Sequence, residues 1–207
     1  MSKKTSRPKK RSTKKVHKSK SRAARNAKKQ KSSKRRAAAV RGNLKPVKLL
    51  AKLEGFLKKN NAKYNARAHR TVFTAYDAAQ TLKVDLRSVV KTLVVQADRN
   101  LVLVALPSNR NLDFGKLRKT LKSAGQPVKK ISLASEKLIS SRITKTPGAV
   151  PPFGGLYRIP TVADRGVLKP RTLILNGGSF TASIEMGPKE YRRVAQPLLG
   201  SFGKARK

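Results

Sequence analysis

The charged side chain best placed for chemistry is Lys91, which lies in the segment VVKTLVV. Side chains of a strand alternate between two faces, and both faces of this segment are largely apolar, which predicts a buried strand carrying one charge. Two interpretations are open. Lys91 lies at the rim of the strand with its ammonium group in water, or it projects into a pocket and binds an anion such as a phosphate or a carbonyl oxygen.

A second unusual segment is the apolar loop TPGAVPPFGG, residues 146–155, which is rich in glycine and proline. Such a loop is either a surface turn or the wall of a pocket built from backbone groups. Gly148 has no Cβ, so backbone N–H groups at this position are able to approach a ligand closely. The prolines and the later glycines would stiffen and turn that wall.

The usual catalytic motifs are missing from the sequence. It contains no phosphate-binding P-loop, no dinucleotide-binding glycine motif, no HExxH and no GxSxG. The chain has no cysteine, and His17 and His69 are its two histidines, so we expect neither a metal site nor a cofactor. Catalysis by such a chain would depend on positioning, on backbone dipoles, on a few cations or on the substrate itself.

The formal net charge of +42 is unevenly distributed, since residues 1–53 hold 22 of the 51 Lys and Arg residues and no acid. A charge of this size attracts polyanions, and nucleic acid gains further because neutralised phosphates release counterions. The sequence shows neither an apolar run long enough to span a bilayer nor the apolar core of a secretory signal. A mitochondrial presequence is disfavoured because lysine outnumbers arginine and no amphipathic face forms. We therefore expect a cytoplasmic protein without a membrane partner.

Residues 1–45 are predicted to be a disordered tail that binds nucleic acid, with a merely solubilising tail as the alternative. Their few apolar residues cannot offset the entropy lost on ordering. The tail residues expected to contact nucleic acid are Lys9, Lys10, Arg11, Lys14, Lys15, Lys28, Lys29, Lys34, Arg35 and Arg36.

Residues 46–200 are predicted to form one α+β domain with a mixed sheet. Periodicity and capping signals predict helices at residues 46–60, 74–82, 114–125, 134–141 and 188–196. Thr74 and Asp77 fit a capping box. Strands are expected at residues 62–69, 89–95, 101–107, 158–164, 171–178 and 181–186, of which the second and third form a hairpin.

Five features, in order, resemble the YbaK/aminoacyl-tRNA synthetase-associated domain family, over about residues 62–197. They are His69 after a short strand, the helix TAYDAAQTL, the strand VVKTLVV, the loop GAVPPFG, and IPTVAD followed by LILNGG. Members of that family are trans-editing deacylases related to the editing insertion of bacterial prolyl-tRNA synthetases. The resemblance implies a barrel-like mixed sheet with surrounding helices and an acyl pocket beside the glycine-rich loop.

The resemblance also implies an activity, the hydrolysis of the ester that joins a wrong amino acid to the terminal adenosine of a tRNA. The implied partner is the acceptor end of a tRNA, with tRNA(Pro) expected, and the tail would contact this RNA, the ribosome or another nucleic acid. In the family the reaction is thought to be largely substrate-assisted, which agrees with a sequence that lacks an evident general base.

Carried over residue by residue, the resemblance assigns catalytic roles to Lys91 and Gly148. Lys91 would position the 3′ end of the tRNA, and Gly148 would lie beside the scissile ester. The substrate contacts that we expect come from Thr92, His69, Phe153, Asn176, Gly177 and Ser183, and Phe73 is a further candidate for the pocket wall. A purely structural role for His69 is equally compatible with the sequence.

The sequence departs from the family pattern at Lys145, Ala149, Pro151 and Ser183. Ser183 stands where some members have an acid that binds the substrate ammonium group. These departures leave the edited amino acid open. They also leave open two other functions, a catalytically degenerate editing fold that binds nucleic acid or ribosomes, and a domain that acts on small acyl conjugates. Asp164 is expected to cap a turn rather than to catalyse.

Overall fold

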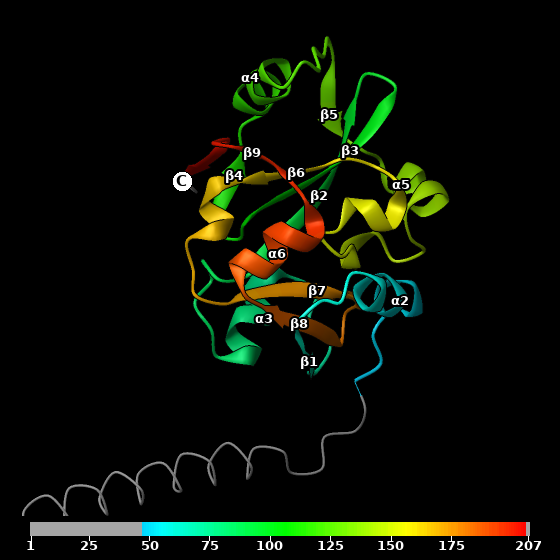
Figure 1. The fold of residues 1–207 in the computed structure, drawn as a ribbon, viewed down its shortest axis with the longest axis vertical. Helices are drawn as coiled ribbons and strands as arrows, with labels where there is room; N and C mark the ends of the chain where they lie inside the picture. Colours follow the sequence, from blue (N-terminus) through cyan, green and yellow to red (C-terminus); the bar gives the residue numbers. More distant parts are fainter. Residues whose placement is uncertain (1–46, 206–207) are drawn as a thin grey trace, which may run out of the picture. The chain divides into compact units, whose positions relative to one another are not determined.

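The structure is a computed structural model that describes residues 47–205 (Figure 1). The chain divides into two units, Met1–Leu44 and Lys45–Lys207, and the described residues all belong to the second. The predicted basic tail, with its ten expected nucleic-acid contacts, lies outside the described residues.

The larger sheet has five strands in the order β5-β2-β3-β6-β9. Strands β2 and β3 form the predicted antiparallel hairpin, and the turn between them begins at Asp98, whose φ of 54° is left-handed. Strand β3 pairs in parallel with β6, and β6 in parallel with β9, so the sheet is mixed, as predicted. The strands are β2 (Val90–Ala97), β3 (Asn100–Pro107), β5 (Ile131–Leu133), β6 (Thr161–Asp164) and β9 (Leu198–Gly200).

A second sheet has three antiparallel strands in the order β1-β8-β7, and a third consists of β10 and β4. Val89 forms a single parallel β-bridge with Ile174, which joins the five-stranded sheet to the three-stranded one. The α+β class is confirmed, but the described strands form separate sheets and do not close into a barrel. The remaining strands are β1 (Asn65–Ala68), β4 (Arg110–Leu112), β7 (Leu173–Ser179), β8 (Ala182–Met186) and β10 (Gly203–Ala205).

Five α-helices of the described part accompany the sheets, and local capping chemistry sets several of their starts. Thr74 and Asp77 form the predicted capping box, while Asp113 and Ser135 accept backbone N–H bonds at two further N-termini. In Figure 1, α3 lies beside the three-stranded sheet and α4 lies at the opposite end of the domain. The helices are α2 (Ala51–Lys59), α3 (Ala75–Leu82), α4 (Phe114–Ser123), α5 (Glu136–Arg142) and α6 (Pro188–Ala195).

The first helix starts later than the sequence predicts, at Ala51 rather than near residue 46. Leu50 is extended, and its N–H donates to the carbonyl of Gly177 at 3.1 Å. Leu50 also packs against Gly178, whose φ of +89° favours glycine and where a Cβ would collide with the Leu50 side chain. Contacts with the end of β7 thus hold this segment out of the helix.

The main core includes three aromatic rings in contact, one of which is that of Phe153 in the glycine/proline loop. Phe153 has its ring centroid 5.8 Å from that of Phe56 and 5.7 Å from that of Tyr191. Tyr191 is fully buried and donates its hydroxyl hydrogen to the carbonyl of Pro152 at 3.1 Å. Burial raises the pKa of Tyr191, so this hydroxyl stays protonated and keeps the loop bound to α6.

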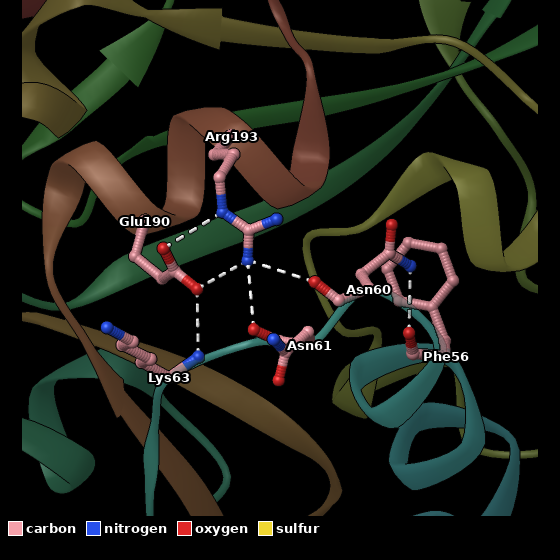
Figure 2. A network of polar contacts seen from close by, with 6 residues as sticks. All are labelled: Phe56, Asn60, Asn61, Lys63, Glu190 and Arg193. Atoms are coloured by element: carbon pink, nitrogen blue, oxygen red, sulfur yellow. Dashed lines mark hydrogen bonds and ion pairs between the residues drawn. The ribbon is translucent and has the colours of Figure 1, made fainter.

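A polar network anchors α6 to the chain between α2 and β1 (Figure 2). Arg193 pairs with Glu190 at 2.6 Å and donates to the carbonyls of Asn60 and Asn61 at 3.0 and 3.2 Å. Glu190 also accepts the N–H of Lys63 at 2.8 Å. The network fixes the start of β1, and the end of that strand leads to His69.

Candidate active site

A cavity of about 240 Å³ lies where β2, the start of α3, the β7–β8 pair and the glycine/proline loop meet. Strand β2, the β7–β8 pair and the loop each contribute at least one residue that the sequence indicated for chemistry. Six of the eight predicted catalytic and substrate-contacting residues line it: His69, Lys91, Thr92, Gly148, Asn176 and Ser183.

His69 lies just beyond β1, where its backbone N–H donates to the carbonyl of Thr181 at 3.0 Å. Its Nδ1 lies 2.8 Å from the carbonyl oxygen of Arg70, and its Nε2 lies 2.9 Å from Oγ of Ser183. A carbonyl oxygen can only accept, so Nδ1 carries the hydrogen. In the neutral imidazole Nε2 is then an acceptor, and the Ser183 hydroxyl donates to it.

This arrangement places an oriented imidazole and a hydroxyl at the cavity wall. A histidine held by a carbonyl at one nitrogen and by a hydroxyl at the other is the geometry in which a hydroxyl is polarised for proton transfer. Ser183 lines the cavity but is only 5% exposed, so little water contacts its side chain before a ligand binds. The pair can bind a polar group of the ligand or help to move its proton.

Lys91 and Thr92 reach the cavity from the N-terminal half of β2. Lys91 is half-buried and lines the cavity, and its binding of an anion there stays a prediction. The hydroxyl oxygen of Thr92 is buried and has no hydrogen-bond partner among the described residues. Buried hydroxyl groups are normally paired, so the hydroxyl of this cavity-lining residue is a candidate partner for a polar ligand group.

Gly148 lies in a short 3-10 helix, η1 (Pro147–Ala149), on the other wall of the cavity. A Cβ built on this residue would lie 3.0 Å from two ring carbons of Phe180. The glycine therefore allows the Phe180 ring to pack directly on the loop backbone, a neighbour that the sequence did not indicate. Phe180 comes from the β7–β8 turn and lines the cavity, as does Phe73.

Two predicted substrate contacts do not line the cavity. Gly177 is buried, and a Cβ there would lie 2.8 Å from the Leu49 side chain, so its small size serves packing. Phe153 is fully buried in the aromatic core described above. Asn176 does line the cavity, and its Oδ1 accepts the N–H of Gly178 at 2.7 Å, within the irregular end of β7.

Asp164 is a structural residue, as the sequence predicted. Its Oδ1 accepts the N–H of Gly166 at 2.8 Å, and its Oδ2 accepts those of Phe202 and Gly203 at 2.8 and 2.7 Å. All donors of this buried carboxylate are backbone groups, so it joins η3 (Arg165–Leu168) to the C-terminal segment.

Three larger cavities lie elsewhere in the described part, and none contains a predicted site residue. One of about 640 Å³ adjoins the β2–β3 turn. A second, of about 720 Å³, includes Ser88, next to the bridge between the sheets. A third, of about 470 Å³, is lined by residues of α4 and β9. The 720 Å³ cavity is lined by five cationic side chains, those of Arg87, Arg110, Arg165, Lys169 and Arg171, and by two acids, Asp164 and Asp85, of which Asp85 pairs with Arg87 at 2.6 Å.

Within residues 47–205, no group of three His, Cys, Asp or Glu side chains is arranged to hold a metal ion. The helices of the same part are all too short or too polar to cross a membrane.

Residues 69–194 match the family model described as the aminoacyl-tRNA editing domain. A structure of a hypothetical protein superposes with a TM-score of 0.64 at 24% identity, covering 74% of this chain and 99% of that one. A candidate trans-editing enzyme for prolyl-tRNA synthetase gives 0.66 at 21% identity, covering 79% and 100%. A candidate signal transduction protein from Marinobacter aquaeolei gives 0.57 at 18%, covering 75% of this chain and 31% of that one. At these identities the superpositions establish a shared fold.

Proposed function

Because this chain belongs to the aminoacyl-tRNA editing domain family, we propose that it hydrolyses the ester between an amino acid and the 3′-terminal adenosine of a tRNA. The observation that carries this proposal is the convergence of His69, Lys91, Thr92, Gly148, Asn176 and Ser183 on one cavity. These residues come from separate segments that the fold brings together.

The size of the cavity indicates which part of the substrate lies inside it. Pockets for drug-sized ligands have volumes of about 300–1,000 Å³, and this one has about 240 Å³. It accommodates a small aminoacyl group but not the nucleoside as well. We therefore place the amino acid inside the cavity and the terminal base outside it.

The reaction needs water to attack the ester carbonyl carbon, the C–O bond to the ribose to break, and the released ribose oxygen to take a proton. Lys91 would hold the terminal phosphate or the carbonyl oxygen, where a fixed cation favours developing negative charge. The Thr92 hydroxyl would hydrogen-bond the aminoacyl group. The His69–Ser183 pair would bind the substrate or the water, and the neighbouring ribose hydroxyl would assist proton transfer.

We propose tRNA(Pro) as the substrate, mischarged with a small amino acid. Support comes from the small cavity and from the structural likeness to a candidate trans-editing enzyme for prolyl-tRNA synthetase. The cationic tail and the cavity lined by Arg87, Arg110, Arg165, Lys169 and Arg171 would bind phosphates without reading the sequence.

The decisive experiment incubates the purified protein with tRNA(Pro) carrying alanine, cysteine, serine or proline and measures ester hydrolysis. We expect turnover of one mischarged species and sparing of prolyl-tRNA(Pro). Lys91→Ala should abolish turnover, while Lys137→Ala, which removes an exposed lysine of α5 outside the cavity, should leave it unchanged.

A second function, RNA binding without turnover, is favoured by the cationic cavity and the charge of +42. Salt-sensitive tRNA binding without hydrolysis of any species would support it and reject the deacylase. A chain lacking residues 1–45 separates the contribution of the tail. If the tail binds phosphates, its deletion should reduce the slope of log K against log salt by about 0.7–0.9 per lost contact.

A further inference from the structure

We propose that Phe73 and Phe180 form a stacking platform for the terminal nucleobase of the RNA, at the exposed edge of the cavity. The inference rests on the proposed function in taking the ligand to be an RNA acceptor end. It assigns a base-binding subsite beside the aminoacyl cavity.

The exposure of Phe73 is the first observation. Its side chain is 72% exposed, more than any other large hydrophobic residue in the described part of the chain. The same residue lines the cavity. Exposed apolar surface at the edge of a cavity is typical of a binding site rather than of a packing defect.

The second observation is that Phe73 is paired. Its ring centroid lies 5.1 Å from that of Phe180, and the two ring planes are tilted by 55°. Phe180 in turn packs on the backbone of Gly148, so its ring is held by the loop. The N–H of Val72 donates to the carbonyl of Phe180 at 2.9 Å, which ties together the backbones that carry the two rings.

A local structural role does not account for Phe73. It directly precedes Thr74, the N-cap of α3, and a hydrophobic residue there often packs on the fourth residue of the helix, here Ala78. Such a contact would bury the Phe73 ring, yet most of it faces solvent. The ring therefore has unused surface where the cavity opens.

A nucleobase fits this surface for two reasons. The cavity is too small to hold an aminoacyl group and its nucleoside together, so the terminal base must lie outside it. Proteins that bind single-stranded RNA ends stack unpaired bases on aromatic rings. Lys91, in the same cavity, and exposed Arg70, next to His69, supply positive charge for the adjoining phosphate.

The test uses uncharged tRNA whose 3′-terminal adenine is replaced by 2-aminopurine, a base whose fluorescence falls when it stacks. We expect quenching by the wild-type chain. Phe73→Leu keeps an apolar side chain before the helix but removes the ring face, and it should abolish most quenching and weaken binding about tenfold. Phe73→Trp should retain quenching.

Phe180→Leu should act like Phe73→Leu, and Phe114→Leu, at an exposed ring of α4 outside this cavity, should have no effect. Thermal melting of each variant shows that it is folded. Bound tRNA with equal quenching by wild type and Phe73→Leu would overturn the proposal, and so would an absence of binding at low salt.

The tRNA in this test carries no amino acid, so the quenching measurement is independent of ester hydrolysis. Quenching without turnover on any mischarged tRNA would keep the stacking platform and reject the deacylase. Turnover of a mischarged tRNA without quenching would support the deacylase and reject the stacking platform. If both hold, Phe73→Leu should raise KM more than it lowers kcat, since the base contact is remote from the ester.

Discussion

Nε2 of His69 and Oγ of Ser183 lie 2.9 Å apart, although the two residues are separated by 114 positions in the sequence. His69 follows β1 and Ser183 lies in β8, and the antiparallel pairing of these strands brings the two side chains together. With Nδ1 of His69 held by the Arg70 carbonyl, the pair has one defined direction of hydrogen bonding.

Ser183→Ala should lower kcat/KM for the deacylation by about 2- to 13-fold, the worth of one neutral hydrogen bond. His69→Asn should lower it at least as far, because it also removes the ring. If the two residues act as a unit, the double variant should be no worse than His69→Asn alone. Additive losses in the double-variant cycle would show that they act separately.

Gly148→Ala should lower deacylation severalfold. Its Cβ would lie 3.0 Å from the Phe180 ring, which must move and change the shape of the cavity. The matched control is Gly55→Ala in α2, where a Cβ meets nothing within 4 Å. This control should leave kcat/KM unchanged and stabilise the fold by about 0.5–1 kcal/mol, measured by urea unfolding. Equal activity of Gly148→Ala and wild type would argue against a role for this wall.

The ion pair of Glu190 and Arg193 should make stability depend on acid. The Arg193 guanidinium and the N–H of Lys63 lower the pKa of Glu190 from 4.5 to about 2. The stabilisation is therefore present above about pH 4.5 and is lost as the pH falls toward 2. Unfolding of wild type and Glu190→Gln should differ most near neutral pH and converge at the acid end.

Arg193→Gln provides the second arm of this experiment. It removes the guanidinium that holds Glu190 and the carbonyls of Asn60 and Asn61 (Figure 2). It should lose most, but not all, of the acid-dependent increment lost in Glu190→Gln, because the N–H of Lys63 still donates to Glu190. A difference from wild type that stays constant from pH 7 to acid would assign the effect to packing instead of charge.

Asp164→Ala should destabilise the fold by at least about 3 kcal/mol, because it leaves backbone donors of Gly166, Phe202 and Gly203 without their acceptor. Asp164→Asn should cost less, since one amide oxygen can replace Oδ2 for two of these donors. The free energy of unfolding from urea titration measures both. Equal losses of unfolding free energy in the two variants would show that the backbone donors do not stabilise the fold through the oxygens of Asp164.

The elements set by local chemistry were predictable from the sequence. The capping box at Thr74, the β2–β3 hairpin and the proline at the start of α6 each depend on residues a few positions apart. The three-residue strands β4, β5, β9 and β10 were not predicted, because each is defined by its distant partner rather than by its own pattern.

In the candidate site, too, motif order indicated some residues correctly, while contacts between distant residues were not predictable. Lys91 and His69 were indicated by the order of motifs, and they do line one cavity. Gly177 and Phe153 belong to the same motifs, but Leu49 and the aromatic core bury them. Phe180 was missed because its importance comes from its position over Gly148, and no spacing in the sequence records that contact.

The bridge between Val89 and Ile174 has a further consequence, for amide hydrogen exchange. Ile174 N–H donates to the Ser88 carbonyl at 2.9 Å, where the two sheets meet, and the cavity has β2 on one side of this junction and β7 and β8 on the other. Separating the sheets here breaks far fewer backbone hydrogen bonds than unfolding either one, so Ile174 should exchange through local opening. A ligand that contacts both sides suppresses that opening, and the exchange rate of this one amide then reports how fully the cavity is occupied.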